Sequence, residues 1–374
     1  MRNSIVTWVV AALAAGVAGA LEAQVPAGAR TSVEVAGHQL MVPQGFAVDV
    51  YAAGVTDARF MVLGPDGVPY LSLTSEGAVV KLPDRNGDGR ADTVITVARG
   101  LHRPHGLAFR GDTLYVAETD RVVRFVPGTA APQVVVPDLP HGSGHFTRTI
   151  VFGPRDGKLY VSVGSSCNIC YERDTRRASV LRFNADGSGG ETFAHGLRNS
   201  VGLAFDPASG ELWGTNNDRD MLGDDLPPDR INILREGGNY GWPECYLPGR
   251  ANPEFPGADC GHLVAPAITF QAHSAPLGIT FSTGTQFPPE YRGGAFACFH
   301  GSWNRSTPTG YKVVYIRQEA GRPVAITDFI TGFLPEGGTA WGRPVDVLVA
   351  RDGSLLVSDD FGGRVLRVHY AAGH

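Results

Sequence analysis

The sequence predicts an all-β protein, and three observations favour this fold class. A β-branched, alternating segment recurs six times, as AVVKLP from residue 78, RVVRFV from 121, SVLRFN from 179, INILRE from 231, KVVYIR from 312 and RVLRVH from 364. These segments follow pairs of apolar runs that are joined by turns such as DG or SG, which is the sequence signature of a β-hairpin. Amphipathic helical runs with capping residues are nearly absent.

The spacing of the repeats predicts the architecture. Equivalent apolar residues are Val80, Val123, Leu181, Ile233, Val314 and Leu366, and most of the steps between them suit one four-stranded propeller blade per repeat. The step from Ile233 to Val314 is much longer, so we expect an insertion near residues 243–265. Six units predict a six-bladed β-propeller of four-stranded antiparallel blades over residues 41–374. A pair of β-sandwiches would not explain six equivalent segments.

An early strand is expected to close the propeller ring. The run GFAVDVYAAG, from residue 45, precedes the first repeat, and the last repeat ends close to the C-terminus. We therefore predict that this run supplies the outer strand of the last blade. Such a closure would remove the free edges of the ring, which otherwise promote aggregation.

The N-terminal segment is predicted to be a targeting signal. Arg2 precedes an apolar run from Ile5 to Ala18, and Ala18-Gly19-Ala20 fits a small-residue cleavage site, with Ala23 as a second option. Residues 1–23 are therefore interpreted as a secretory signal peptide, residues 24–40 as a linker, and the mature chain as periplasmic or secreted without a membrane span. An uncleaved membrane anchor is the alternative, although the apolar run is short for one.

Composition limits the possible partners. The net charge is −5 and the Lys and Arg residues are dispersed, which argues against nucleic acid. Five cysteines fit an oxidising compartment. The economical pairing is Cys167 with Cys170 and Cys245 with Cys260, leaving Cys298 free, but the sequence does not fix this connectivity. Tyr171 follows Cys170, so this C-x-x-C pair is not a c-type haem attachment site.

Two groups of residues placed just before strands suggest catalysis. His145 precedes the strand-like run TIVFG, where a histidine could serve as a general base because its ordinary pKa is near neutral. The alternative is a histidine that only binds a neighbouring carbonyl group. Arg198 and Asn199 precede VGLAFD, and the planar fork of an arginine suits a carboxylate or a quinone oxygen. The alternative for Arg198 is a surface salt bridge of little energetic value.

Other polar groups suggest a metal ion and an anionic ligand. Residues 216–220, with Asp224, Asp225 and Asp229, offer the oxygen ligands that Ca²⁺ prefers, or they form a solvated acidic turn. The HGSWNR segment from His300, together with Lys312 and Arg343, could converge on a polyanionic ligand. Residues 84–92 resemble half of a calcium loop, but Ile95 replaces the final glutamate, so the segment is either a weak calcium site or a polar hairpin loop.

Taken together, the motifs resemble the soluble glucose/sorbosone dehydrogenase family. His145, GLRNSVGLAFDP, NNDRD, INILREGGNYGWP, HGSWNR and WGRPVD occur in the family's order over about residues 40–370, and SCNIC and HGSWNR are closer to its sorbosone-type branch. The family consists of six-bladed propellers that use pyrroloquinoline quinone (PQQ) and calcium. The resemblance therefore implies both cofactors for this chain.

The resemblance also implies roles for individual residues. His145 would be the general base, Arg198 and Asn199 would contact the quinone, and Lys312 and Arg343 would hold PQQ. The ligands of the catalytic calcium would come from Asn217, Asp218 and Arg219, and those of a second, structural calcium from Asp229 and the Tyr240 carbonyl. The chain departs from the family at Arg230, where an acidic residue is expected, and at Val345, where a second arginine is expected.

These observations predict an exported, PQQ- and calcium-dependent dehydrogenase. It would oxidise an aldose or a sorbosone-like sugar at the hemiacetal or aldehyde carbon and pass electrons to an external acceptor such as a quinone, a cytochrome or a dye. A calcium-dependent lactonase on a six-bladed propeller is one alternative. A non-catalytic propeller that binds a carbohydrate or a protein is another, because fold does not fix function.

Overall fold

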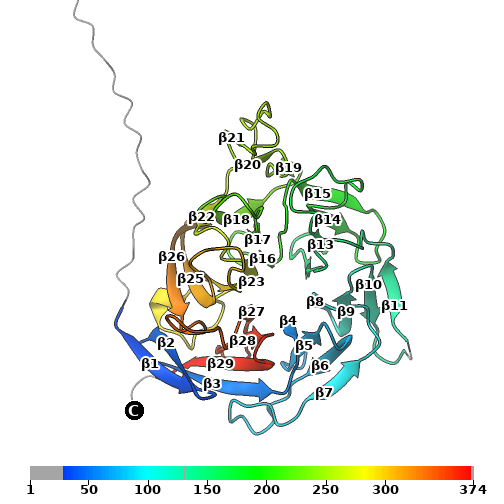
Figure 1. The fold of residues 1–374 in the computed structure, drawn as a ribbon. Coiled ribbons are helices and arrows are strands. Elements are labelled where there is room, and N and C mark those ends of the chain that lie inside the picture. Colours follow the sequence, from blue (N-terminus) through cyan, green and yellow to red (C-terminus); the bar gives the residue numbers. More distant parts are fainter. Residues whose placement is uncertain (1–27, 130, 372–374) are drawn as a thin grey trace, which may run out of the picture.

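The structure, a computed structural model, describes residues 28–129 and 131–371 and confirms the six-bladed β-propeller (Figure 1). The predicted signal peptide, residues 1–23, lies outside the described residues, as do residues 24–27 of the predicted linker. In the described part of the chain there is no α-helix, and the one helical element is the short 3₁₀ helix η1 (Pro289–Tyr291). No helix of the described residues is long and apolar enough to cross a membrane.

The first three blades follow one another along the chain. The first blade contains β4 (Ala58–Leu63), β5 (Pro69–Leu73), β6 (Ala78–Lys81) and β7 (Ile95–Ala98). The second contains β8 (Leu107–Arg110), β9 (Thr113–Ala117), β10 (Val122–Phe125) and β11 (Gln133–Val136). The third contains β12 (Ile150–Phe152), β13 (Leu159–Val163), β14 (Ser179–Phe183) and β15 (Glu191–His195).

The last three blades include the long insertion and the ring closure. The fourth contains β16 (Leu203–Phe205), β17 (Leu212–Asn216), β18 (Asp229–Leu234) and β22 (Ile268–Phe270). The fifth contains β23 (Pro276–Phe281), β24 (Ala295–Phe299), β25 (Lys312–Glu319) and β26 (Arg322–Ile330). The sixth contains β27 (Pro344–Val349), β28 (Leu355–Asp359), β29 (Arg364–Tyr370) and β3 (Phe46–Ala53).

The predicted closure of the ring is confirmed. Strand β3 pairs antiparallel with β29, from Arg364 opposite Ala53 to Tyr370 opposite Phe46. Part of the predicted linker is more ordered than we expected, because β1 (Arg30–Val35) and β2 (His38–Pro43) form a hairpin. Leu40 and Val42 of this hairpin are fully buried in a core cluster shared with the fifth and sixth blades, so apolar burial anchors the segment.

The long step between repeats holds an insertion at the rim of the fourth blade (Figure 1). It contains β19 (Gly238–Asn239), β20 (Cys245–Leu247) and β21 (Arg250–Ala251). Strand β19 adds a parallel edge to β15 of the third blade, and β20 and β21 form a small hairpin. The disulfides join Cys167 to Cys170 and Cys245 to Cys260, and Cys298 is free and buried in β24, as the economical pairing predicted.

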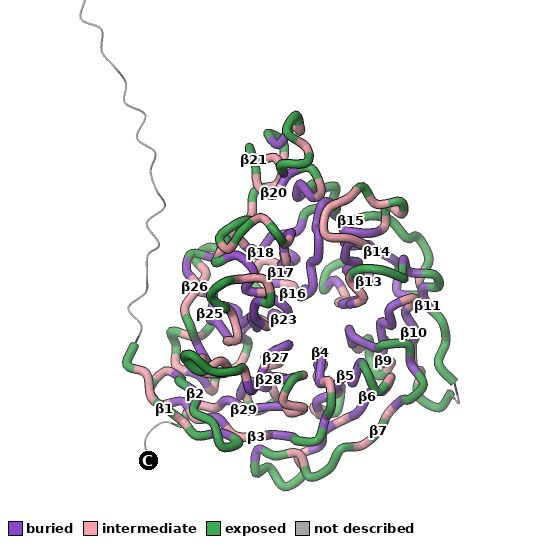
Figure 2. Tube along the Cα trace, viewed as in Figure 1, coloured by how far each residue is buried: buried purple, intermediate pink, exposed green. Residues whose placement is uncertain are grey.

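The core lies between the faces of adjacent blades. The second strands β13, β17, β24 and β28 are buried along their whole length, which explains why they read as nearly continuous apolar runs (Figure 2). Within a four-stranded antiparallel blade, the loop between the second and third strands lies at the same end as the connection to the next blade. Two loops per blade therefore meet at one mouth of the ring.

Candidate active site

A cavity of about 440 Å³ opens at this mouth. Its size is in the range of cofactor and ligand sites. The described residues that line it come mainly from the loops of the third to sixth blades. The cavity brings together most of the predicted site residues, namely His145, Arg198, Asn199, Asn217, Asp218, Asp229 and Arg343.

His145 is positioned as a neutral base. Its Nδ1 lies 3.0 Å from the carbonyl oxygen of Ser165 and 3.1 Å from Ser165 Oγ. A carbonyl oxygen can only accept a hydrogen bond, so Nδ1 carries the proton and Nε2 keeps its lone pair. Burial, followed by the charge of Arg198, lowers the pKa of His145 to about 3. The imidazole is therefore neutral at neutral pH, with its one proton on Nδ1.

A glycine allows His145 and Asn199 to approach each other. A Cβ atom at Gly164 would lie 2.5 Å from Asn199 Oδ1 and 2.6 Å from the Cβ of His145. Real Cβ atoms do not make contacts this short, so any side chain at position 164 would push the two residues apart. The residue that permits this arrangement is therefore Gly164, which directly follows β13.

Arg198 is held by four hydrogen bonds. Its NH1 donates to the carbonyl oxygen of Asp218 at 2.7 Å, and its NH2 donates to Asp220 Oδ2 at 2.6 Å. Its Nε donates to the main-chain oxygen of Asn168 at 3.2 Å, and NH2 also donates to Asn168 Oδ1 at 3.0 Å. The guanidinium group is nearly buried, so these bonds fix its plane at the wall of the cavity.

Asn199 and Asn217 are linked by a backbone hydrogen bond. The two residues form an isolated antiparallel bridge in which Asn217 N donates to Asn199 O at 3.0 Å. Asn217 Nδ2 also donates to the carbonyl oxygen of Pro276 at 2.7 Å, which ties the fourth blade to the fifth. The loops of two blades are thereby fixed relative to each other at the cavity.

A guanidinium group lies beside the residues of the expected second calcium site. The guanidinium of Arg230 pairs with Asp218 Oδ2 at 2.6 Å and donates to the carbonyl oxygens of Tyr240 and Tyr246. Asp229 accepts hydrogen bonds from the backbone N–H groups of Asp218 at 3.1 Å and of Ala275 at 2.9 Å. The Arg230 guanidinium already contacts the Tyr240 carbonyl, so the calcium ion shared by Asp229 and Tyr240 stays a prediction that this geometry does not favour.

Two other predicted residues lie away from the cavity. Lys312 is the first residue of β25, and its Nζ pairs with Asp328 on the neighbouring strand β26 at 2.6 Å. Its predicted contact with PQQ is not supported, because the ion pair draws the side chain toward the outer strand. The side chain of Arg219 pairs with Glu254 of the insertion at 2.5 Å. A guanidinium group carries no oxygen, so Arg219 could offer a metal ion only its backbone carbonyl.

Arg343 and His300 of the HGSWNR segment meet at the cavity. Arg343 Nε donates to the carbonyl oxygen of His300 at 3.1 Å, and its NH2 donates to that of Gly301 at 2.8 Å. His300 Nε2 lies 3.0 Å from Asp360 Oδ1. Burial lowers the pKa of His300 to about 4 despite this carboxylate. A second neutral histidine therefore lines the cavity.

Sequence reasoning missed Asp360, which binds His300, and Arg59, which binds Asp360. Asp360 accepts a hydrogen bond from Arg59 NH1 at 2.7 Å, and Arg59 itself lines the cavity. The two residues are 301 positions apart and meet only because the ring closes between the first and last blades. No local pattern could have found this pair.

Two further residues at the mouth have exposed or unpaired groups. Trp303 lines the cavity while 73% of its surface remains exposed. Among the described residues, the buried Oδ1 of Asn304 has no hydrogen-bond partner, and this side chain also lines the cavity. An unpaired buried acceptor beside a cavity is a natural partner for a hydroxyl donor on a ligand.

The donor set fits the two implied cofactors. Arg59, Arg198 and Arg343 place three guanidinium groups on one cavity, which suits a planar polyanion such as PQQ. Ca²⁺ prefers hard oxygen ligands. The cavity offers such oxygens from the side-chain amides of Asn199 and Asn217 and from the backbone carbonyl groups that follow Asn217. The carbonyl oxygen of Asp218 accepts one hydrogen bond from Arg198 and keeps a second lone pair.

The fold and the cavity thus define a six-bladed propeller with a basic, histidine-containing pocket at the mouth of its channel. The model of the TrAA12-like family matches residues 40–252 and 249–371. The chain belongs to this family.

Named relatives agree with this placement. The chain is 32% identical over 352 residues to an uncharacterised protein of Borreliella burgdorferi, covering 88% of this chain and 91% of that protein. It is 28% identical over 297 residues to a pyrroloquinoline quinone-dependent sugar dehydrogenase of Hypocrea jecorina, covering 63% of this chain and 65% of that protein. The resemblance to PQQ-dependent sugar dehydrogenases is confirmed at this level, and the sorbosone-type branch stays a prediction.

A solved structure shows the same fold. The calcium structure of the Trichoderma reesei family AA12 enzyme superposes with a TM-score of 0.78 at 23% sequence identity. The match covers 91% of this chain and 99% of that chain, so the whole propeller is shared.

Proposed function

We propose that the protein is a PQQ- and calcium-dependent dehydrogenase that oxidises a sugar at its hemiacetal or aldehyde carbon. The observation that carries this proposal is the state of His145. Its neutral imidazole has the proton on Nδ1 and a free lone pair on Nε2, and three guanidinium groups share its cavity. The relative named as a pyrroloquinoline quinone-dependent sugar dehydrogenase supports the substrate class.

The cavity residues divide the work of holding the cofactors. Arg59, Arg198 and Arg343 would bind the carboxylate and quinone oxygens of PQQ, and the oxygens of Asn199 and residues 217–219 would bind Ca²⁺. When bound, PQQ supplies an acceptor for two electrons, which leave the sugar carbon as a hydride. The Ca²⁺ ion is proposed as a Lewis acid.

The remaining chemistry belongs to the protein side chains. His145 Nε2 would take the proton from the sugar hydroxyl, while Nδ1 stays bonded to Ser165 and keeps the ring in place. Arg198 would stabilise negative charge that develops on the acceptor, because its fork is already oriented by four hydrogen bonds. The unpaired Oδ1 of Asn304 would accept a hydrogen bond from another sugar hydroxyl.

The electrons must leave for another molecule. The sequence contains no C-x-x-C-H haem motif, so we propose an external acceptor such as a quinone, a cytochrome or a dye. The two disulfides are consistent with the proposed periplasmic or secreted location, because such bonds persist in oxidising compartments.

The lactonase alternative is less well supported by the cavity. A metal-dependent lactonase needs carboxylates that are free to ring the ion. Here Asp218 pairs with Arg230, Asp220 pairs with Arg198, and Asp229 accepts two backbone N–H groups. The carboxylates at the cavity are therefore already bound by protein groups.

Reconstitution tests the proposed function. The purified protein would be loaded with PQQ and Ca²⁺, and dye reduction would be followed across a panel of aldoses, with cofactor-free protein as the blank. We expect turnover with at least one sugar only when both cofactors are present. Hydrolysis of a lactone without dye reduction would favour the lactonase, and a spectral change of PQQ without turnover would favour the binding protein.

A further inference from the structure

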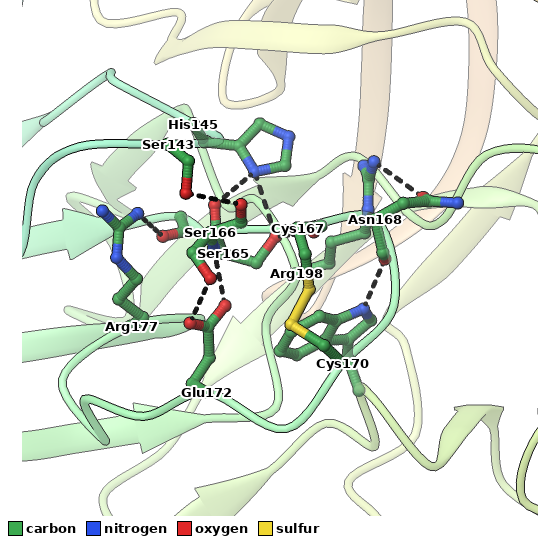
Figure 3. Close-up of a disulfide and its surroundings, with 12 residues drawn as sticks. Ser143, His145, Ser165, Ser166, Cys167, Asn168, Cys170, Glu172, Arg177 and Arg198 are labelled. Atoms are coloured by element: carbon green, nitrogen blue, oxygen red, sulfur yellow. Dashed lines mark hydrogen bonds between the residues drawn. A yellow bond between two sulfur atoms is a disulfide. The ribbon is translucent and has the colours of Figure 1, made fainter.

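The loop closed by the first disulfide touches both proposed catalytic residues. This segment, Ser165 to Cys170, is here called the disulfide loop, and it lies beneath His145 and beside Arg198 (Figure 3). Neither cysteine is among the described residues that line the cavity. Any influence of the disulfide on the site must therefore pass through the residues between and beside the two cysteines.

One end of the disulfide loop fixes His145. The carbonyl oxygen of Ser165 accepts hydrogen bonds from the backbone N–H and from Nδ1 of His145, both at 3.0 Å. The backbone N–H of Ser165 donates to the carbonyl oxygen of Arg198 at 2.8 Å, so the same residue also holds the second motif. Ser165 Oγ donates to the carbonyl oxygen of Cys167 at 2.6 Å, which links this end to the disulfide.

The other contact of the loop is the amide of Asn168, which lies between the two cysteines. Asn168 Oδ1 accepts hydrogen bonds from Arg198 NH2 at 3.0 Å and from the backbone N–H of Asp220 at 2.8 Å. Asn168 Nδ2 donates to the carbonyl oxygen of Asp220 at 3.0 Å. The main-chain oxygen of Asn168 accepts from Arg198 Nε at 3.2 Å and from Trp242 Nε1 at 3.0 Å.

Asp220 extends this network into the cavity. Its Oδ2 accepts a hydrogen bond from Arg198 NH2 at 2.6 Å, and its Oδ1 accepts one from Asn304 Nδ2 at 3.0 Å. Asn168 therefore orients Arg198 twice, directly and through the backbone of Asp220. An amide is required here, because the position must supply both an acceptor and a donor.

We propose that Asn168 is a positioning residue for Arg198, and that the Cys167–Cys170 disulfide holds Asn168 in the geometry this task needs. The proposal rests on the proposed function, since it assigns Asn168 to the same reaction. The two bonded cysteines that flank Asn168 restrict its backbone. The Asn168 amide in turn sets the orientation of the Arg198 guanidinium plane. Catalytic hydrogen bonds lose much of their effect when their supporting contacts are loosened.

The test compares variants at Asn168 with a double-mutant cycle. Asn168→Ala removes the side-chain contacts, and Asn168→Asp keeps the acceptor but loses the Nδ2 donor. We expect kcat to fall about 10- to 100-fold in Asn168→Ala, by analogy with the loss of other supporting contacts, with a smaller fall in Asn168→Asp. The sugar KM should change by less than about threefold, since Asn168 does not line the cavity.

The cycle separates positioning from general destabilisation. In the Arg198→Lys background, which lacks the planar fork, the further change Asn168→Ala should have almost no effect on kcat, because there is no guanidinium left to orient. The proposal would be overturned if the kcat loss of the double variant equalled the product of the two single losses. It would also be overturned if the kcat of Asn168→Ala stayed within about twofold of wild type.

The disulfide is tested with a matched pair. The Cys167→Ser/Cys170→Ser variant should lose kcat in the same direction as Asn168→Ala, whereas Cys245→Ser/Cys260→Ser should keep kcat within about twofold of wild type. Equal effects of the two double variants on kcat would overturn the role of the short disulfide.

A readout without turnover separates this proposal from the proposed function. A crystal structure of cofactor-free Asn168→Ala protein should show the Arg198 guanidinium rotated away from its place in the wild-type protein, and PQQ fluorescence titration should show weaker binding. An unmoved guanidinium would overturn the positioning role even if the wild-type protein proved inactive toward every sugar. An inactive wild type with a displaced guanidinium in the variant would overturn the proposed function alone.

Discussion

The two disulfide-closed segments of this propeller have different surroundings. Cys167 and Cys170 are three residues apart in sequence and lie beside the cavity, next to the contacts of His145 and Arg198. Cys245 and Cys260 are 15 residues apart and close the insertion at the rim. The insertion contacts the blades through Glu254, which pairs with Arg219, and Glu244, which accepts a hydrogen bond from Tyr171.

The two disulfides differ in loop length, so one is expected to affect protein stability and the other the orientation of site residues. In the chain-entropy model, a disulfide stabilises a protein by restricting the unfolded chain, and closing a loop of about 15 residues contributes about 3 kcal/mol. A three-residue loop restricts the unfolded chain less. The longer disulfide is therefore expected to act mainly on the free energy of unfolding, and the shorter one mainly on the geometry of the site.

The largest expected effect is at the residue held by the short loop. His145→Ala should lower kcat by about 10²–10⁴-fold, because the proton acceptor for the sugar hydroxyl is lost. PQQ affinity should stay close to that of wild type, since the guanidinium groups of the cavity remain. Dye reduction with reconstituted protein and PQQ fluorescence titration measure the two quantities. Normal turnover of this variant would rule out His145 as the base.

The next effect concerns the long loop. Cys245→Ser/Cys260→Ser should lower the free energy of unfolding by about 3 kcal/mol, measured by denaturant titration under non-reducing conditions. A matched Cys167→Ser/Cys170→Ser variant is expected to lose less. If the short-loop variant lost more stability than the long-loop variant, the division between the two disulfides would be wrong.

A smaller effect is expected at the open side of the cavity. Trp303→Ala should raise the sugar KM several-fold, because an exposed aromatic face at the mouth offers a stacking surface worth about 0.5–1.5 kcal/mol. Tyr171→Ala is the control, since Tyr171 is also exposed but contacts the insertion through Glu244 and Phe255. Steady-state kinetics should show an unchanged KM in the control. Equal KM changes in both variants would argue against a stacking role.

The smallest effect is the response of activity to mild acid. Because the pKa of His145 is lowered to about 3 from 6.5, the imidazole stays unprotonated down to pH 5. We therefore expect kcat/KM to change little between pH 7 and pH 5, whereas a histidine of ordinary pKa would lose roughly 30-fold. An acid limb with an apparent pKa between 6 and 7 would contradict this.

The same shift has a defined sign for stability. The unfolded chain takes up the proton first as the pH falls, because its histidine has the higher pKa. The contribution of neutral His145 to stability is therefore complete above about pH 6.5 and is lost as the pH falls toward 3.

The fold was predictable because its signal is periodic. Six equivalent strands, their turns and the extra early strand are all local patterns, and each followed from the sequence and was confirmed. Several site residues were also predictable, since His145, Arg198 and Asn217 stand in loops before or after strands of adjacent blades. The resemblance supplied the roles that geometry alone does not.

The remaining site residues depend on contacts that no local pattern encodes. Arg59 and Asp360 meet across the closure of the ring. Asn168 lies between Cys167 and Cys170, and only the fold reveals that its amide contacts Arg198. Lys312 pairs with Asp328 on the neighbouring strand, a contact that no local pattern encodes, and its role in holding PQQ stays a prediction.

The closure between β3 and β29 also has a consequence for the order of events during synthesis. Residues 46–53 are made early, yet their partner strand lies at residues 364–370, so the last blade cannot be completed until almost the whole chain has been made. Pairing so distant in sequence also slows folding, because a long segment must be ordered before the contact forms. The ring therefore stays open until the segment at residues 364–370 has been made.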